Sequence, residues 1–214
     1  MSRRLVGLST VPLEQLPERC RGCMYWQHDA VLPRECGVLR DEEAYRAWCS
    51  DVMAMSGEYG RAAVDDDGLL GFVVFGPSTA FAQARHLPSG PPDPSASFLA
   101  CLHLTPHARG RGLGTVLLRA ALRDLAQRGG RSVQAFADAT GRGVETSPMV
   151  SVEFLLRQGF TVERAHPQVP LLKLDLRTLV SLNENLEAVL ESLRIRIAVP
   201  RHAPATLSTP DRPR

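Results

Sequence analysis

Arginine and glycine alternate in residues 109–114, Arg-Gly-Arg-Gly-Leu-Gly, a composition typical of a turn that binds an anion. The turn follows an apolar stretch, 97–104, and precedes a run in which apolar residues recur with the helical period. Glycine lets the backbone come close to a phosphate, and the N–H groups at a helix N-terminus attract negative charge. The spacing therefore predicts a strand, a phosphate-binding turn and a helix. The alternative is a turn that needs glycine only for its conformation, with both arginines in solvent.

Two other nucleotide-binding motifs do not fit this turn. The dinucleotide fingerprint needs G-x-G-x-x-G, and the spacing of Gly110, Gly112 and Gly114 differs from it. A P-loop needs Gly-Lys followed by Ser or Thr, and the sequence contains no such triplet. Nucleic-acid binding by the arginines has little support, because no extended basic stripe accompanies them.

Arg109, Gly112 and Gly114 resemble the [Q/R]-x-x-G-x-[G/A] signature of the GNAT superfamily of acyl-CoA N-acyltransferases. The resemblance covers residues 60–176 well and the N-terminal third loosely. It implies acetyl-CoA as co-substrate, with the pantetheine arm along the strand and the pyrophosphate on the turn. The cofactor-binding residues that it implies are Leu102, Leu104, Arg109, Gly110, Arg111, Gly112, Leu113, Gly114 and Thr115.

His103 is the candidate catalytic base. Acetylation of an amine requires a group, or a chain of water, that removes a proton from the substrate ammonium, and an imidazole with a pKa near 6.5 suits this role. Because side chains alternate along a strand, His103 and Cys101 should share the face opposite Leu102 and Leu104. The alternative is that His103 is a packed histidine and Cys101 a buried thiol.

No residue of the sequence is evident as the general acid. Members of the family that the turn resembles often carry a tyrosine four residues before the glycine of a Gly-Phe pair, where it protonates the leaving thiolate. The pair here is Gly159-Phe160, so that position is Leu155, preceded by Phe154. Neither side chain donates a proton. Direct attack on a well-oriented thioester is still feasible, since orientation alone supplies much of the barrier reduction.

Cys20 and Cys23 form a C-x-x-C pair followed by Tyr25 and Trp26, an arrangement that resembles an N-terminal element of some bacterial GNAT proteins. A zinc site would need two further ligands. The nearest thiol and imidazole groups in the sequence are Cys36, Cys49 and His28. A redox pair should follow a strand in a thioredoxin-like unit, and that context is missing. We expect small thiols packed beside the aromatic residues and no metal.

Composition places the chain among ordinary globular proteins. Of its 214 residues, 44% are hydrophobic and 22% charged, and the formal net charge is +2. Such a charge gives no reason to expect a nucleic acid or a membrane as partner. No apolar run approaches the roughly 20 residues of a membrane span, and no signal peptide is evident. We therefore expect a cytoplasmic protein with five reduced cysteines.

The order of predicted elements favours an α/β (α+β) fold that resembles the GNAT fold, a mixed and mainly antiparallel sheet flanked by helices, with two splayed central strands. The predicted strands are 5–8, 60–64, 69–75, 97–104, 132–137, 160–163 and 169–176. The predicted helices are 10–16, 41–55, 112–128 and 149–158. Residues 76–95 should form a long substrate-side loop, because five prolines interrupt any regular pattern.

Three parts are expected along the chain. Residues 1–176 should form one acyltransferase domain, residues 177–197 an amphipathic helix with a leucine stripe, and residues 198–214 a disordered tail rich in Pro, Ala, Thr and Ser. The stripe could pack on the chain's own sheet or on a partner, so a homodimer remains an open alternative.

The function that these features favour is transfer of an acetyl group from acetyl-CoA to a primary amine. The acceptor, a small molecule or a protein amine, should lie between the N-terminal helices and the 76–95 loop. Because the tyrosine is missing at Leu155, a non-catalytic acyl-CoA-binding module or sensor is the alternative. A zinc-stabilised interaction protein is a third interpretation. The sequence leaves the acyl-chain length open, since one methylene changes binding in an apolar pocket by only ~1–3 kcal/mol.

Overall fold

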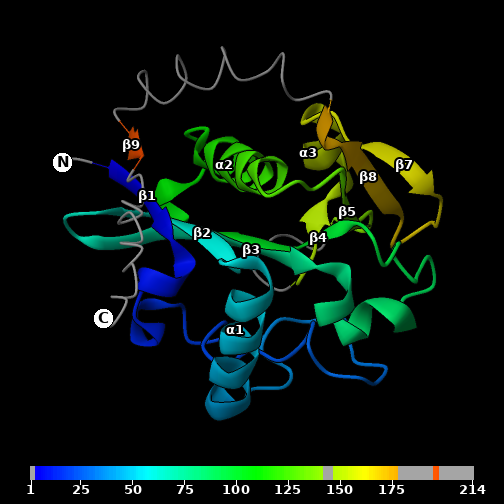
Figure 1. Cartoon of the computed structure of the whole chain (residues 1–214), viewed down its shortest axis with the longest axis horizontal. Coiled ribbons are helices and arrows are strands. Elements are labelled where there is room, and N and C mark those ends of the chain that lie inside the picture. Colours follow the sequence, from blue (N-terminus) through cyan, green and yellow to red (C-terminus); the bar gives the residue numbers. More distant parts are fainter. Residues whose placement is uncertain (1–2, 142–146, 178–194, 198–214) are drawn as a thin grey trace, which may run out of the picture.

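The fold is built on one twisted sheet (Figure 1). The computed structural model describes residues 3–141, 147–177 and 195–197. The strand order is β7-β8-β5-β4-β3-β2-β1-β9, and β6 pairs with β5 beside this path. The strands are β1 (Arg3–Gly7), β2 (Gly60–Asp65), β3 (Gly68–Pro77), β4 (Ser97–Leu104), β5 (Ser132–Asp138), β6 (Val150–Ser151), β7 (Thr161–Arg164), β8 (Leu171–Asp175) and β9 (Ile195–Ile197).

The sheet is mixed and mainly antiparallel, and this confirms the predicted fold class. Strands β1 to β4 form an antiparallel meander in space, as do β5, β8 and β7. Strands β4 and β5 are parallel and pair only at Ser97↔Val133 and Phe98↔Gln134. Beyond these two pairs they separate, and β6 takes the edge of β5 at Ala137. The two central strands are therefore splayed.

Helices cover both faces of the sheet (Figure 1). The helices are α1 (Glu42–Ser56), α2 (Leu113–Gln127) and α3 (Val152–Arg157). Helix α1 lies on one face, with α2 and α3 on the other. Asp41 caps α1 by accepting a hydrogen bond of 2.9 Å from the N–H of Ala44, and Gly57 ends the helix in the left-handed conformation.

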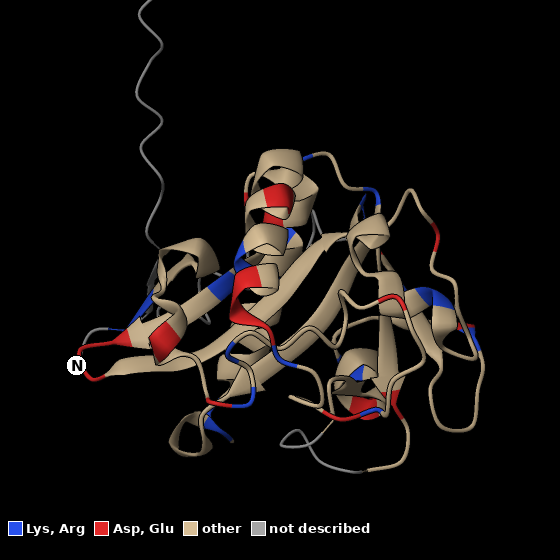
Figure 2. Cartoon of the chain, turned by 90° about the horizontal axis from the view of Figure 1, so that it is seen from below, with Lys and Arg blue, Asp and Glu red and all other residues tan. Residues whose placement is uncertain are grey.

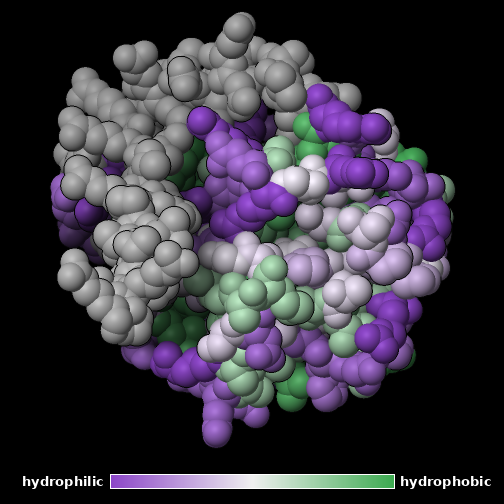
Figure 3. Space-filling view, in the orientation of Figure 1, coloured by the Kyte–Doolittle hydropathy of each residue, from purple (hydrophilic) through white to green (hydrophobic). Residues whose placement is uncertain are grey.

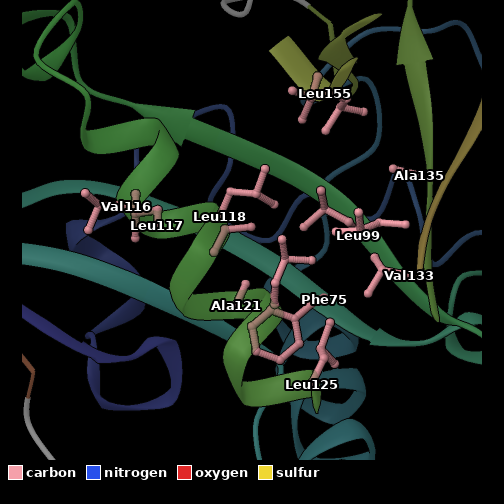
Figure 4. Packing of buried hydrophobic residues seen from close by; sticks show 14 of the residues in the cluster. Phe75, Leu99, Val116, Leu117, Leu118, Ala121, Leu125, Val133, Ala135 and Leu155 are labelled. Carbon is pink, nitrogen blue, oxygen red and sulfur yellow. The ribbon is translucent and has the colours of Figure 1, made fainter. Parts of the chain in front are cut away.

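Helix α2 follows the predicted helical period closely. Its residues Val116, Leu117 and Ala121 are fully buried against Phe75 and Leu99 of the sheet (Figure 4). Its outward face is hydrophilic (Figure 3). An amphipathic helix that buries one face on a sheet is stabilised mainly by this packing rather than by its own hydrogen bonds. This helix is the element that carries the predicted phosphate-binding turn.

Some elements differ from their predictions. The predicted helix 10–16 is replaced by two 3₁₀ turns, Leu8–Thr10 and Leu13–Gln15. The 76–95 loop also contains 3₁₀ turns, Ser78–Ala80 and Ala82–His86, and buries apolar side chains of its own. The predicted helix 149–158 begins only at residue 152, because residues 150–151 pair with β5 instead. At residues 150–151 the long-range pairing with β5 outweighs local helix propensity.

Part of the predicted C-terminal helix, residues 177–197, can be compared with the structure. Residues 195–197 form the strand β9, parallel to β1, so the prediction of helix is wrong for these three residues. The rest of that helix (178–194) and the predicted tail (198–214) lie outside the described residues. Among the helices that the structure describes, none is long and apolar enough to cross a membrane.

A buried ion pair fixes α2 to the sheet. The side chains of Arg61 on β2 and Asp124 on α2 are only 13% and 11% exposed, and Arg61 Nε donates to Asp124 Oδ2. Arg128, the C-cap residue of α2, donates to the carbonyl oxygens of Ser56, the last residue of α1, and of Glu58. Other charged residues of both signs are interspersed over the surface (Figure 2).

We expect Asp124→Ala to lower the free energy of unfolding by about 3–5 kcal/mol, because it leaves the Arg61 guanidinium buried without its carboxylate. Urea denaturation measures this loss. The matched control is Glu14→Ala, which removes an exposed pair with Arg46 and should hardly move the midpoint. Equal midpoints for the two variants would contradict a structural role for the buried pair.

Candidate active site

The predicted phosphate-binding turn has the backbone geometry of an anion site. Gly110 and Gly112 adopt φ angles of 72° and 77°, a conformation that glycine adopts without strain. Gly112 is the N-cap of α2, and its carbonyl accepts from the N–H of Val116 at 3.2 Å. Within the described part of the chain no side chain caps this helix. Helix geometry therefore leaves the first-turn N–H groups, on residues 113–115, available to a ligand.

Two arginines flank these N–H groups in different ways. Arg109 curls back on the strand, where its Nε donates to the carbonyl of Leu104 at 3.2 Å. Arg111 is exposed at the tip of the turn. Arg109 therefore ties the turn to the end of β4, whereas Arg111 adds positive charge where an anion would approach.

The backbone edge of β4 faces the opening between the splayed strands. The N–H of Thr105 donates to the carbonyl of Leu70 on β3 at 2.9 Å. Because backbone groups alternate in direction along a strand, those of Leu104 and Leu102 point away from β3, toward β5. Strand β5 no longer pairs with β4 there. An extended ligand could hydrogen-bond this edge as an added strand does.

The side chains of Leu102 and Leu104 point toward α2. A Cβ added to Gly114 would lie 3.5 Å from Leu104 Cδ1 and 3.7 Å from Leu102 Cδ2, an ordinary van der Waals distance. Turn, helix start and open strand edge therefore lie next to one another. The structure brings together all nine predicted cofactor-binding positions, 102, 104 and 109–115.

His103 and Cys101 lie on the opposite face of β4, as their alternation predicts. The His103 ring stacks on Phe72 with ring centroids 5.6 Å apart. Cys101 packs against the cluster of residues on that face, and burial raises the pKa of its thiol well above the ordinary value. The thiol therefore stays protonated near neutral pH and is a poor nucleophile.

Leu155 belongs to the core and not to the opening. It is fully buried in the cluster beneath α2. The preceding residue, Phe154, is partly buried, and its Cζ lies 3.7 Å from the position of a Cβ on Gly114. The side chain of α3 that approaches the turn is therefore an aromatic ring without a proton to donate. Ser151 caps α3 by accepting from the N–H of Phe154 at 3.3 Å.

The cysteines of the N-terminal segment remain free thiols. The N–H of Gly37 donates to Cys23 Sγ at 3.4 Å, so the segment that contains Cys36 lies beside the C-x-x-C pair. Burial raises the pKa of Cys20 and of Cys36 to about 12. Over the ranges that the structure describes, no three His, Cys, Asp or Glu side chains form a group that could hold a metal ion.

The aromatic residue Trp26 of this segment lies beside the central strands, a location that the sequence pattern does not predict. Trp26 contacts Phe98 and Phe136, with ring centroids 5.1 and 6.3 Å away, at the point where β4 and β5 part. Its Nε1–H donates to the carbonyl of Pro148 at 3.3 Å. The C-x-x-C-x-aromatic pattern is recognisable in the sequence, but it does not predict which part of the sheet these rings contact.

Two hollows are formed by the elements between which the sequence predicts the acceptor. One has a volume of about 440 Å³ and lies between the 8–16 segment and α1, where Tyr45, Cys49 and Tyr59 line it. The other has about 250 Å³ and is formed by the 76–95 loop, with Phe81 and Arg85 in its wall. Neither is lined by residues of the turn.

Comparison with known proteins gives a family and several structures of similar fold. The model of the acetyltransferase (GNAT) family matches residues 22–160. No curated protein sequence matches the chain. Among solved structures, PaiA N-acetyltransferase from Thermoplasma acidophilum in complex with coenzyme A is 19% identical with a TM-score of 0.50, over 82% of this chain and 99% of that one.

Two further structures have slightly higher TM-scores. An N-acetyltransferase from Staphylococcus aureus Mu50 is 16% identical, with a TM-score of 0.53 over 82% of this chain and 99% of that one. The yncA protein of Salmonella typhimurium, solved with its cofactor acetyl-CoA, is 14% identical, with a TM-score of 0.53 over 82% of this chain and 95% of that one. At such identities these structures establish the fold alone. The family match spans well over half of the sequence, and the chain therefore belongs to the GNAT family of acetyltransferases.

Proposed function

We propose that this acetyltransferase moves the acetyl group of acetyl-CoA to a primary amine, on a small molecule or a protein. The observation that carries the proposal is the position of the uncapped start of α2 directly beside the open edge of β4. The first site suits a pyrophosphate and the second suits an extended amide chain. Coenzyme A contains both groups in this order.

The residues of the turn would bind the pyrophosphate. The N–H groups of Leu113, Gly114 and Thr115 supply hydrogen bonds, and the helix dipole adds about 0.3–1 kcal/mol at an exposed site. Arg111 adds charge at the mouth. The pantetheine arm would then run back along β4, hydrogen-bonded first to the N–H of Leu104, whose carbonyl already accepts from Arg109, and then to the backbone of Leu102. The thioester would lie beyond Leu102.

Catalysis in this arrangement is mainly a matter of orientation. The amine nitrogen attacks the thioester carbonyl, a C–N bond forms, the C–S bond breaks, and the sulfur leaves with the electron pair. We propose His103 as the base that takes the proton from the amine nitrogen, directly or through water. Its ring stacks on Phe72 on the face of β4 opposite α2, and this is the face from which we expect the acceptor to approach. The thiolate takes its proton from solvent, because Leu155 and Phe154 offer none.

A non-catalytic acyl-CoA-binding module is the second candidate. The observation that favours it is that neither position considered for the general acid can donate a proton, since Leu155 is in the core and the α3 side chain that approaches the turn is Phe154. Binding of acetyl-CoA without turnover over a broad panel of amines would support this second candidate. Turnover with any amine would exclude it.

We expect acetyl-CoA to stabilise the protein against heat. A ligand at 100 times its dissociation constant adds about 2.7 kcal/mol, which corresponds to a shift of roughly 5–10 °C for a chain of this size. Gly112→Glu places a carboxylate at the N-cap of α2 and should abolish the shift. Thermal unfolding with and without acetyl-CoA measures both effects.

Gly129→Glu is the matched control for this experiment. Gly129 lies beyond the other end of α2, also has a positive φ, and has nothing within 4 Å of an added Cβ. It therefore carries the same backbone strain and the same added charge far from the turn. If neither the parent nor this control is stabilised by acetyl-CoA while both are folded, the proposed function is wrong.

We also expect no covalent acetyl-enzyme. Because burial raises the pKa of the Cys101 thiol, the thiolate is scarce at neutral pH. Its fraction increases only as the pH rises toward the raised pKa. After incubation with acetyl-CoA alone, the tryptic peptide that contains Cys101 should carry no acetyl group by mass spectrometry. Its alkylation by iodoacetamide should be slow at pH 7 and faster in alkali. An acetylated Cys101 peptide would indicate a two-step reaction instead.

A further inference from the structure

The point at which β4 and β5 separate limits the space at the end of the proposed cofactor site. The last pair between these strands is Phe98↔Gln134. A ligand that runs along the open edge of β4, from the turn toward the start of the strand, moves steadily toward this point. The acyl group is the last part of acyl-CoA along that path and would face it.

Three aromatic side chains fill one face of the sheet at this point. Trp26, Phe98 and Phe136 are 4%, 0% and 1% exposed. The ring centroid of Phe98 is 5.1 Å from that of Trp26 and 5.8 Å from that of Phe136. Trp26 is held by its hydrogen bond to Pro148 and by an edge contact with Tyr25 at 5.1 Å. Rings that are packed and hydrogen-bonded in this way cannot move aside cheaply.

Aliphatic side chains fill the other face at the same level. Leu99, Val133 and Ala135 come from the two separating strands and are at most 1% exposed. They pack with Leu118 and Leu155 in the cluster beneath α2 (Figure 4). The point of separation is therefore filled from both faces, although by different kinds of side chain.

We propose that Trp26, Phe98 and Phe136 restrict the acyl group to acetyl and exclude longer linear chains. This inference rests on the proposed acetyl-CoA site and adds the donor selectivity that the sequence leaves open. An acyl chain with several more methylenes would have to enter a packed core, and such overpacking is disfavoured by about tenfold or more in affinity.

Phe136 is the residue whose truncation should change this selectivity most. It lies on β5, across the opening from β4, and contacts both other rings. Phe136→Ala would leave an apolar cavity at the end of the acyl path, and a cavity of this kind takes up apolar groups in preference to water. Phe136→Leu makes a smaller cavity and should change the selectivity in the same direction, with less risk to folding.

The test is calorimetric binding of coenzyme A, acetyl-CoA, butyryl-CoA and hexanoyl-CoA to the full chain, which needs no acceptor. For the parent we expect hexanoyl-CoA to bind at least about tenfold more weakly than acetyl-CoA. In Phe136→Ala, and to a lesser degree in Phe136→Leu, this ratio should fall toward one. Phe160→Ala is the matched control, because Phe160 is 2% exposed but belongs to the cluster beneath α2 and not to that of the three rings.

The outcomes separate this inference from the proposed function. If the parent binds acetyl-CoA and hexanoyl-CoA equally well, the cofactor site stands and the aromatic limit is wrong. The limit is also wrong if Phe160→Ala changes the ratio as much as the Phe136 variants do. If no member of the series binds to the folded parent, the proposed function itself fails.

Discussion

The separation of β4 from β5 after the pair Phe98↔Gln134 creates an open strand edge, beside which the turn and the start of α2 lie. A strand edge whose N–H and C=O groups lack partners is costly wherever water is excluded. On β5 the backbone groups at Ala137 and Asp138 have partners within the protein, because β6 pairs with the strand there. On β4 the strand continues to Leu104 with the backbone groups of Leu102 directed into the opening. The proposed pantetheine arm would complete the hydrogen bonding that the sheet leaves open there.

The proposed binding site at the start of α2 is held in place because the rest of the helix is fixed to the sheet. The apolar face of α2 packs on the sheet, and the ion pair between Asp124 and Arg61 fixes its second half to β2. Arg109 then holds the turn against the end of β4. The helix N-terminus and the strand edge are therefore positioned largely by core packing and by the pair of Asp124 and Arg61, which lie away from the proposed ligand. Such preorganisation is what makes orientation an effective source of catalysis.

Local chemistry explains why much of this fold was predictable. The turn with Gly110 and Gly112, the helix that follows it and the hairpin between β2 and β3 all depend on residues close in sequence. Prediction was wrong where a distant partner decides the conformation. Residues 150–151 have a helical pattern but extend to pair with β5, and Ile195–Ile197 form a strand beside β1. In the 8–16 segment two short 3₁₀ turns replace the predicted helix, and its three leucines are buried in the cluster that contains Phe72.

Three features could be read from the order of residues alone: the glycine-rich turn before a helix, the family resemblance, and the alternation that puts His103 and Cys101 on one face of β4. Each of these depends on spacing along a single element, which the chain carries in its own order of residues. Two other features depend on the folded chain. Leu155 lies in the core while Phe154 approaches the turn, and Trp26 lies against Phe136 where the central strands separate. These are contacts between segments far apart in the chain. Their geometry depends on how helices and loops pack over a splayed sheet, and no local pattern encodes it.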